Sequence, residues 1–106
     1  MNEMSKKYLY NEETVRENMP AKAGVYRLIY EYNKKYYVFY AGQSEDLKER
    51  LLEHLRPAEP DECIKKYLQK YICFIRFVEI DLQNERDKRE KKEIEDYSPS
   101  CNRPNE

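Results

Sequence analysis

The chain has 106 residues, of which 39% are charged, and its 20 basic and 21 acidic side chains leave a formal net charge of −1. This length predicts one compact domain. The balance of charge excludes a uniformly basic surface for non-specific nucleic-acid binding, but not a local basic patch. We expect no membrane partner, because no stretch approaches the roughly 20 apolar residues of a membrane span and the opening residues, MNEMSKKYLYNEET, contain no apolar signal region.

The first half of the sequence predicts a helix followed by a hairpin. Residues 11–20 form a short predicted helix, which Asn11 can cap and a proline ends. Apolar and polar side chains alternate over GVYRLIYEY, residues 24–32, which predicts a strand. The polar residues 33–35, NKK, predict a turn, and YYVFYAG at 36–42 predicts the second strand of the hairpin.

A second predicted helix follows the hairpin. Ser44 is its expected capping residue, and Leu47, Leu51 and Leu55 recur every four residues as its buried stripe. After the proline-containing segment RPAEP, Asp61 is expected to cap a third helix.

The remaining sequence predicts one more strand and one more helix. Residues 71–80, YICFIRFVEI, are rich in β-branched and aromatic side chains and predict a strand. The highly charged residues from 84 to about 96 predict a helix supported by i,i+4 ion pairs. Three strands separated by helices indicate an α+β domain with a small, at least partly antiparallel sheet.

The three cysteines, Cys63, Cys73 and Cys101, are an odd number and show no CxxC spacing. We interpret them as reduced thiols that pack as small hydrophobic side chains in a cytoplasmic protein. Metal binding and nucleophilic chemistry are the less favoured interpretations.

A group of candidate functional residues lies where the second strand meets the following helix. Arg50 and His54 are one helical turn apart, and Gly42 would let a ligand approach the backbone. Arginine suits a phosphate, and histidine can exchange a proton near neutral pH. Tyr40, Arg50 and His54 could therefore face one cleft, although solvated helix charges and a packing tyrosine would give the same pattern.

The arrangement resembles the GIY-YIG endonucleases. Gly-Val-Tyr at 24–26 and Tyr-Ala-Gly at 40–42 resemble the paired motif of that family, and Arg50 lies eight residues after the second motif's glycine, as the family's arginine does. The end of the chain resembles the family's closing pattern, which would place its residues at Glu90, Ile94, Tyr97, Pro99 and Asn102. The resemblance covers roughly residues 20–102.

The resemblance implies a three-stranded antiparallel sheet flanked by helices, over a nuclease domain at 20–106 that follows an N-terminal extension with a short helix at 1–19. It also implies an enzyme that cleaves phosphodiester bonds in DNA with one divalent cation, Mg²⁺ or Mn²⁺. Such an endonuclease or nickase would act in DNA repair, recombination or defence against mobile elements.

The resemblance further implies a role for each matching residue. Tyr26 and Tyr40 would line the active site, and one of them, or His54, would activate the attacking water. Arg50 would bind the scissile phosphate, and Glu90 would be the only protein ligand of the metal. A single carboxylate is enough for Mg²⁺, which keeps most of its waters. The choice of general base stays open, because tyrosine is a poor base at neutral pH and histidine a better one.

Other residues would support the site or the substrate. Asn102 would brace the site through hydrogen bonds, and Gln43 takes a place where the family frequently has lysine. Lys34 and Lys35 in the hairpin turn are candidate DNA contacts, together with lysines of the third predicted helix. Because the surface offers little positive charge, we expect low sequence specificity, a homodimer or a separate DNA-targeting protein.

Two other interpretations remain. The first is a catalytically silent member of the family that serves as a nucleic-acid or protein interaction module. The second is a regulatory α+β domain that matches by coincidence, and it predicts no spatial clustering of the candidate side chains.

Overall fold

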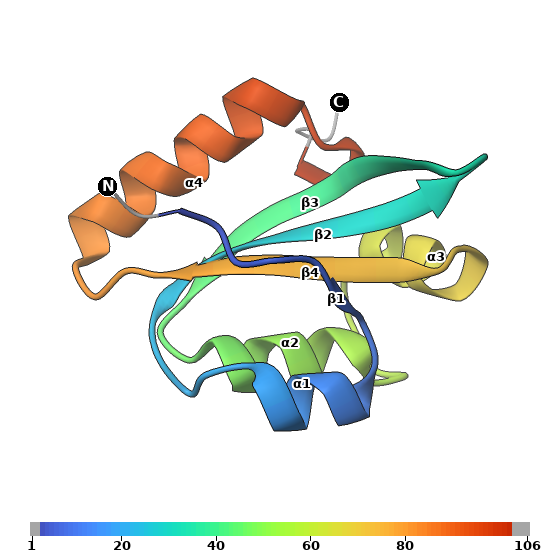
Figure 1. Cartoon of the computed structure of the whole chain (residues 1–106), viewed down its shortest axis with the longest axis horizontal. Coiled ribbons are helices and arrows are strands. Elements are labelled where there is room, and N and C mark those ends of the chain that lie inside the picture. The colour runs from blue at the N-terminus through green and yellow to red at the C-terminus, as the bar shows by residue number, and fades with distance from the viewer. Residues whose placement is uncertain (1–2, 103–106) are drawn as a thin grey trace.

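The structure, a computed structural model, describes residues 3–102 and consists of one antiparallel sheet with helices on both faces (Figure 1). Its strand order is β1-β4-β2-β3, so the prediction of an α+β fold is confirmed. The strands are β1 (Tyr8–Leu9), β2 (Gly24–Tyr32), β3 (Lys35–Ser44) and β4 (Cys73–Glu79). The helices are α1 (Glu12–Asn18), α2 (Leu47–Leu55), α3 (Glu62–Lys70), α4 (Gln83–Tyr97) and the 3₁₀ turn η1 (Ser100–Asn102).

The sheet has four strands, so the expectation of three strands is wrong by one. The additional strand, β1, is two residues long and pairs antiparallel with β4, with Tyr8 opposite Ile75 and Leu9 opposite Phe74. The backbone N–H of Ser5 extends this pairing by donating to the carbonyl of Phe77 at 2.7 Å. A strand of two residues is too short to show alternation, so only its tertiary partner defines it.

The predicted hairpin between β2 and β3 is confirmed. Asn33 and Lys34 adopt left-handed backbone angles, with φ of 52° and 63°. Two consecutive residues of this kind match the right-handed twist of the flanking strands and form the tight turn. Strand β3 continues two residues past its predicted end, so Gly42 lies inside the strand, opposite Tyr26.

Helices α1 and α2 cover one face of the sheet below it in Figure 1, and α3 adjoins the same side. This face holds the main core, in which Leu47 and Leu51 of the predicted stripe are fully buried and Leu55 is partly buried. Burying one leucine completely stabilises the fold by about 1.5–3 kcal/mol. None of the helices within residues 3–102 is long and apolar enough to cross a bilayer.

The opposite face of the sheet is covered only in part. Helix α4 lies above it in Figure 1, and a small cluster of Val25, Val78 and Ile80 packs on this side. Two charged side chains of α4 are buried as well: Arg86 donates to the Ile80 carbonyl, and Glu93 pairs with Arg27 of β2 at 2.7 Å. The rest of this face is left uncovered by helices.

Two of the three expected helix caps are confirmed. Asn11 caps α1 and Asp61 caps α3, each through its side-chain oxygen. The expectation for Ser44 is wrong, because Asp46 caps α2 by accepting from the N–H of Glu49 at 3.0 Å. The longer β3 keeps Ser44 in the strand, where its hydroxyl instead accepts from the N–H of Asp46.

Two of the cysteines form a disulfide, so the expectation of three reduced thiols is wrong for this pair. Cys63 of α3 and Cys101 of η1 are bonded, with Cα atoms 5.5 Å apart and 38 positions apart in sequence. Cys73 is a free, buried cysteine, and burial raises the pKa of its thiol to about 12. Neither the spacing nor the odd count indicates which two of the three cysteines meet, because their approach depends on packing between distant elements.

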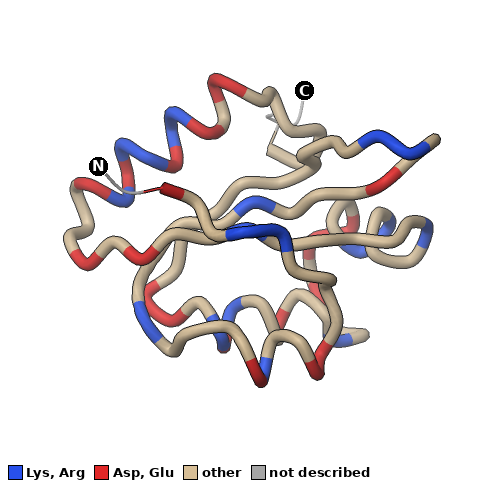
Figure 2. Tube along the Cα trace, viewed as in Figure 1, with Lys and Arg blue, Asp and Glu red and all other residues tan. Residues whose placement is uncertain are grey.

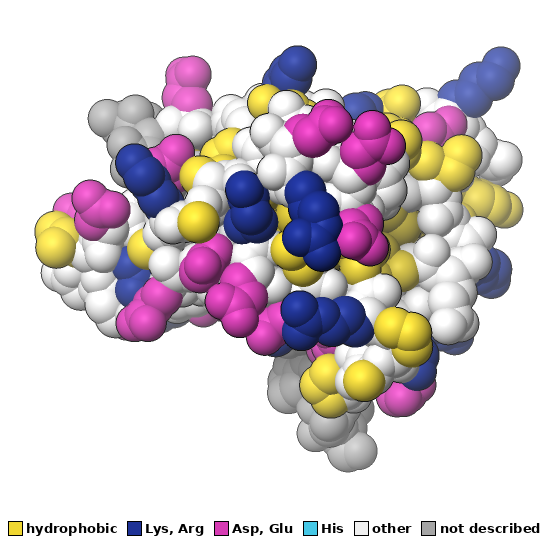
Figure 3. All heavy atoms as spheres, turned by 90° about the horizontal axis from the view of Figure 1, so that it is seen from below, with side chains coloured by type: hydrophobic (Ala, Val, Ile, Leu, Met, Phe, Trp, Pro, Cys, Tyr) yellow, Lys and Arg dark blue, Asp and Glu magenta, His cyan; other side chains and the backbone are white. Residues whose placement is uncertain are grey.

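Charges of both signs are spread over the molecule. Basic and acidic positions alternate along α4, and basic positions gather at the hairpin turn and in the segment before β1 (Figure 2). The face on the side of α1 and α2 carries acidic and basic side chains intermingled (Figure 3). This mixture agrees with the formal net charge of −1.

Candidate active site

The site begins with two tyrosines on neighbouring strands. Tyr26 of β2 is fully buried, and its ring centroid lies 6.0 Å from that of Tyr40 on β3. A Cβ atom at Gly42 would lie 2.7 Å from the Tyr26 hydroxyl oxygen and 2.7 Å from the Tyr40 ring. Gly42 is therefore required because a larger residue would collide with the Tyr26 phenol. We had expected a different reason, namely that glycine lets a ligand approach the backbone.

His54 is held between a tyrosine and a carboxylate. Its Nε2 lies 2.8 Å from the Tyr26 hydroxyl and its Nδ1 lies 3.0 Å from Oε2 of Glu59. The side chain is buried, with 1% of its surface exposed, so the alternative of a solvated helix histidine is wrong. Because an ionised carboxylate only accepts hydrogen bonds, Nδ1 carries the proton and Nε2 accepts from Tyr26.

The surroundings of His54 keep it neutral. Burial lowers the pKa of its imidazole, and the positive charge of Arg50 lowers it further, while Glu59 opposes the shift. Neutral histidine with an unprotonated Nε2 is the form that can take up a proton from Tyr26.

Glu59 is a functional candidate that the sequence interpretation missed. It is buried in the segment between α2 and α3, and its second oxygen, Oε1, accepts from the N–H of Asp61 at 2.9 Å. Its place between Pro57 and Pro60, five residues after the single histidine, is the only signal in the sequence. Prolines fix the backbone on either side and so hold the carboxylate toward His54.

Arg50 lies on α2, near Tyr26 and Tyr40. Its side chain is 37% exposed, and Nη1 lies 3.3 Å from Oε1 of Glu53. Burial raises the pKa of both Tyr26 and Tyr40, whereas the positive charge of Arg50 opposes the rise in each. The guanidinium thus lies within electrostatic reach of both phenols while remaining accessible to a ligand.

Glu90 approaches the same two tyrosines from α4. Its negative charge adds to the burial that raises the pKa of Tyr26 and Tyr40. The carboxylate is half-buried, and its Oε1 accepts from Nε2 of Gln43 at 3.0 Å. Glu90 therefore lies beside β3, next to Gln43, and its role as the metal ligand stays a prediction.

Gln43 binds to α4 and not to open solvent. Its amide nitrogen also donates to Asp87 at 2.8 Å, and its amide oxygen accepts from Gln83 at 2.9 Å and from Arg86 at 3.3 Å. These bonds hold β3 and α4 together beside Glu90. A role of Gln43 in binding substrate stays a prediction.

The donor set at this site fits one loosely held divalent cation. Within residues 3–102, no group of three or more histidine, cysteine or acidic side chains is arranged to enclose a metal ion. Glu90 offers a carboxylate held by Gln43, and a carboxylate oxygen that accepts a hydrogen bond can also ligate a cation. Mg²⁺ suits such a site, since it is bound through one or two carboxylates and keeps several waters.

Asn102 fastens the end of the chain to β3. Its Oδ1 accepts from the N–H of Ala41 and its Nδ2 donates to the Ala41 carbonyl, both at 2.8 Å. Since β3 is an edge strand, this amide takes the place of a further strand next to Tyr40. The side chain therefore acts on the backbone and not on the tyrosine rings.

The two predicted lysine contacts lie elsewhere. Lys34 is in the hairpin turn and Lys35 begins β3, five residues before Tyr40. At the usual rise of a strand this separation is about 17 Å. The structure does not bring these lysines together with Arg50, and their contact with DNA stays a prediction.

The sequence and the fold both match known nuclease domains. Residues 22–105 match the sequence model of the GIY-YIG catalytic domain. No curated protein matches the chain by sequence.

Among solved structures, the chain is similar to the GIY-YIG N-terminal endonuclease domain of UvrC from Thermotoga maritima. One structure, a tyrosine-to-phenylalanine variant bound to its catalytic divalent cation, is 21% identical, with a TM-score of 0.65 over 87% of this chain and 98% of that chain. Another, bound to magnesium, is also 21% identical, with a TM-score of 0.64 over 86% of this chain and 98% of that chain. At this level of identity the likeness establishes the fold.

Proposed function

Since the protein belongs to the GIY-YIG family, we propose that it is an endonuclease or nickase that hydrolyses phosphodiester bonds in DNA. One observation carries the proposal: the Tyr26 hydroxyl, bonded to His54, lies against Gly42 beside the Tyr40 ring, and the next residue, Gln43, binds Glu90. A cation-binding carboxylate and a phosphate-binding guanidinium beside groups that can move protons are the parts that phosphodiester hydrolysis needs.

A divalent cation completes the proposed site. The UvrC domain of Thermotoga maritima has been crystallised with its catalytic divalent cation, which is magnesium in one structure. In this protein Glu90 would hold the ion, and the bound ion would supply charge that stabilises the phosphate oxygens during attack. Mg²⁺ and Mn²⁺ both fit a hard oxygen ligand.

Three side chains form the proposed path for the proton of the attacking water, and a fourth, Glu59, stabilises its end point. Tyr40 is half-buried, its ring centroid lies 6.0 Å from that of Tyr26, and the buried Tyr26 is bonded to Nε2 of His54. Water gives a proton to the Tyr40 oxygen as Tyr40 passes its own proton to Tyr26, and Tyr26 passes its proton to His54. The imidazolium that forms is stabilised by Glu59. No phenolate has to persist, which matters because burial makes both tyrosines weaker acids.

The hydroxide produced in this way attacks phosphorus, the bond from phosphorus to one ester oxygen breaks, and the leaving oxygen takes up a proton from water to become a sugar hydroxyl. Negative charge grows on the non-bridging oxygens during the attack. Arg50 is the side chain of this chain that can bind those oxygens, since its guanidinium is fixed near the tyrosines and remains partly exposed.

The pH dependence of cleavage tests the proposed base. Since the pKa of His54 is lowered by burial and by Arg50, the neutral base persists below the ordinary value of about 6.5. Activity should therefore fall toward acid pH with a midpoint below about 6.5, as His54 becomes protonated. Initial rates of plasmid cleavage, measured between acid and neutral pH, give the midpoint of this fall in activity. A midpoint clearly above 6.5 would contradict the proposed path.

The decisive experiment for the proposed function is a nicking assay on supercoiled plasmid. With Mg²⁺ or Mn²⁺, wild-type protein should convert the plasmid to the open-circular or linear form, and EDTA should abolish the conversion. The Glu90→Gln variant, which keeps shape and hydrogen-bonding capacity but loses the charge that attracts the cation, should be inactive at low Mg²⁺. Equal activity of Glu90→Gln and wild type would rule out Glu90 as the metal ligand.

The second candidate function is a catalytically silent module that binds nucleic acid or protein. The near-neutral surface charge favours it, since it provides little non-specific attraction to DNA. It predicts no nicking with any divalent cation at any pH. Participation in DNA repair, a cytoplasmic location, and a homodimer or separate targeting protein remain parts of the proposal.

A further inference from the structure

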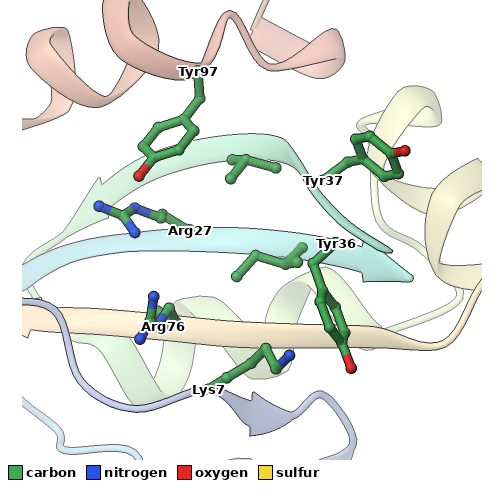
Figure 4. A pocket seen from close by; sticks show the side chains of 8 residues that line it. Lys7, Arg27, Tyr36, Tyr37, Arg76 and Tyr97 are labelled. Carbon is green, nitrogen blue, oxygen red and sulfur yellow. The ribbon is translucent and has the colours of Figure 1, made fainter. Parts of the chain in front are cut away.

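A pocket lies on the sheet face that α4 leaves partly open. It has a volume of about 270 Å³, and eight described residues line it (Figure 4): Lys7, Arg27, Ile29, Tyr36, Tyr37, Val38, Arg76 and Tyr97. None of these eight is acidic. Arg27 and Tyr26 are neighbours on β2, and adjacent side chains of a strand point to opposite faces. This pocket therefore lies on the opposite face of the sheet from the ring of Tyr26.

The positive charges of the pocket are only partly neutralised. Arg27 is paired with Glu93 at 2.7 Å. Arg76 uses its Nε to donate to the Ser5 carbonyl at 3.0 Å. Within residues 3–102, neither Lys7 nor Arg76 forms an ion pair with a carboxylate. The pocket thus keeps net positive charge although the whole chain is close to neutral.

Aromatic rings accompany these cations. The amine of Lys7 lies 2.9 Å from the ring centroid of Tyr36, and the guanidinium carbon of Arg27 lies 4.6 Å from that of Tyr97. Both rings are substantially exposed, with 50% of the surface of Tyr36 accessible. Figure 4 shows the Tyr36 ring extending toward Lys7 on the strand face.

We propose that this pocket binds single-stranded nucleic acid, with phosphates at Lys7 and Arg76 and a base that takes the place of the Lys7 amine on the ring of Tyr36. Exposed aromatic side chains combined with unpaired cations are the features that bind single strands without sequence preference. A duplex is disfavoured because its bases are already stacked and cannot reach a ring on a sheet face. The site would hold an unpaired strand away from the point of cleavage, and its binding does not depend on cleavage.

The test is binding of a short fluorescein-labelled oligothymidylate to the full chain, measured by fluorescence anisotropy in EDTA. Tyr36→Ala should raise Kd about tenfold, since stacking of one base contributes about that factor or more. The matched control is Tyr32→Ala. Tyr32 is 54% exposed and lies at the end of β2, where its ring packs edge-on against Tyr71. The Kd of Tyr32→Ala for the oligonucleotide should equal that of wild type.

Salt dependence tests the phosphate contacts separately. Lys7→Gln and Arg76→Gln should each reduce the slope of log K against log salt concentration by about 0.7, the value for one single-strand phosphate contact. Lys22→Gln removes an exposed lysine outside the pocket and should leave the slope unchanged. Thermal unfolding of each variant identifies any loss of folding, and the exposed position of Tyr36 keeps that variant informative.

Several outcomes would overturn the inference. The inference fails if wild type does not bind the oligonucleotide or if Tyr36→Ala binds it with wild-type affinity. It also fails if a labelled duplex binds wild type equally well and loses the same affinity in Tyr36→Ala. If Tyr36→Ala instead dissociates a homodimer without changing oligonucleotide binding, a second copy occupies the pocket. A chain that binds through Tyr36 but never nicks plasmid would support this inference while overturning the proposed function.

Discussion

Replacing Arg50 by alanine is expected to slow plasmid nicking by about 10²–10³-fold, the usual loss when one fixed donor to a developing oxyanion is removed. The effect should appear mainly in kcat, because the guanidinium is expected to bind the phosphate oxygens most strongly while their charge grows. Arg50→Lys should recover only part of the activity, since an ammonium group cannot form the two parallel hydrogen bonds of a guanidinium.

The control for this prediction is Arg56→Ala. Arg56 is exposed just after α2 and is not among the residues that contact the tyrosines. Its removal tests whether any lost positive charge near the helix slows nicking. Thermal unfolding should show little change for Arg50→Ala, because its ion pair with Glu53 is partly exposed and contributes little stability. Wild-type nicking by a folded Arg50→Ala protein would contradict the proposed role.

Breaking the disulfide between Cys63 and Cys101 is expected to lower the free energy of unfolding by about 4 kcal/mol, from the chain entropy that a loop of this length regains. The same change should weaken the attachment of η1, in which Asn102 holds the backbone of Ala41 next to Tyr40. Nicking by the reduced protein should therefore decrease at temperatures well below global unfolding.

Urea unfolding of wild type and Cys63→Ser, each with and without dithiothreitol, measures the effect. Dithiothreitol should reduce the stability of wild type to that of the variant and should not affect the variant. The double variant Cys63→Ser with Cys101→Ser should match the single one, because only one covalent bond is lost. Unchanged stability of wild type in dithiothreitol would show that the bond contributes nothing in solution.

Most of the candidate site residues could be predicted from the sequence because their types and spacing are local. The two tripeptide motifs lie on the paired strands of one hairpin, so Tyr26 and Tyr40 had to be neighbours once the hairpin formed. Arg50 and His54 follow on the next helix, one turn apart. Glu90 was identified from the family pattern, and its hydrogen bond to Gln43 places it beside this group.

Other features depended on contacts between distant segments. Glu59 and His54 meet because the proline-containing segment after α2 turns back on the helix, and the local sequence shows only a chain break. The partner of Cys101 could not be inferred, since 38 positions separate it from Cys63. Burial of His54 likewise follows from the packing of α2 on the sheet and not from the helix itself.

By itself, the sequence determined the order of the main helices and strands, the hairpin and the group of candidate site residues, because alternation, capping and motif spacing act over a few residues. Only the tertiary structure decided the fourth strand, the carboxylate behind His54, the disulfide and the basic aromatic pocket. Each of these needs side chains or backbone from segments far apart in the chain, and their meeting is fixed by the packing of the whole domain and not by any local pattern.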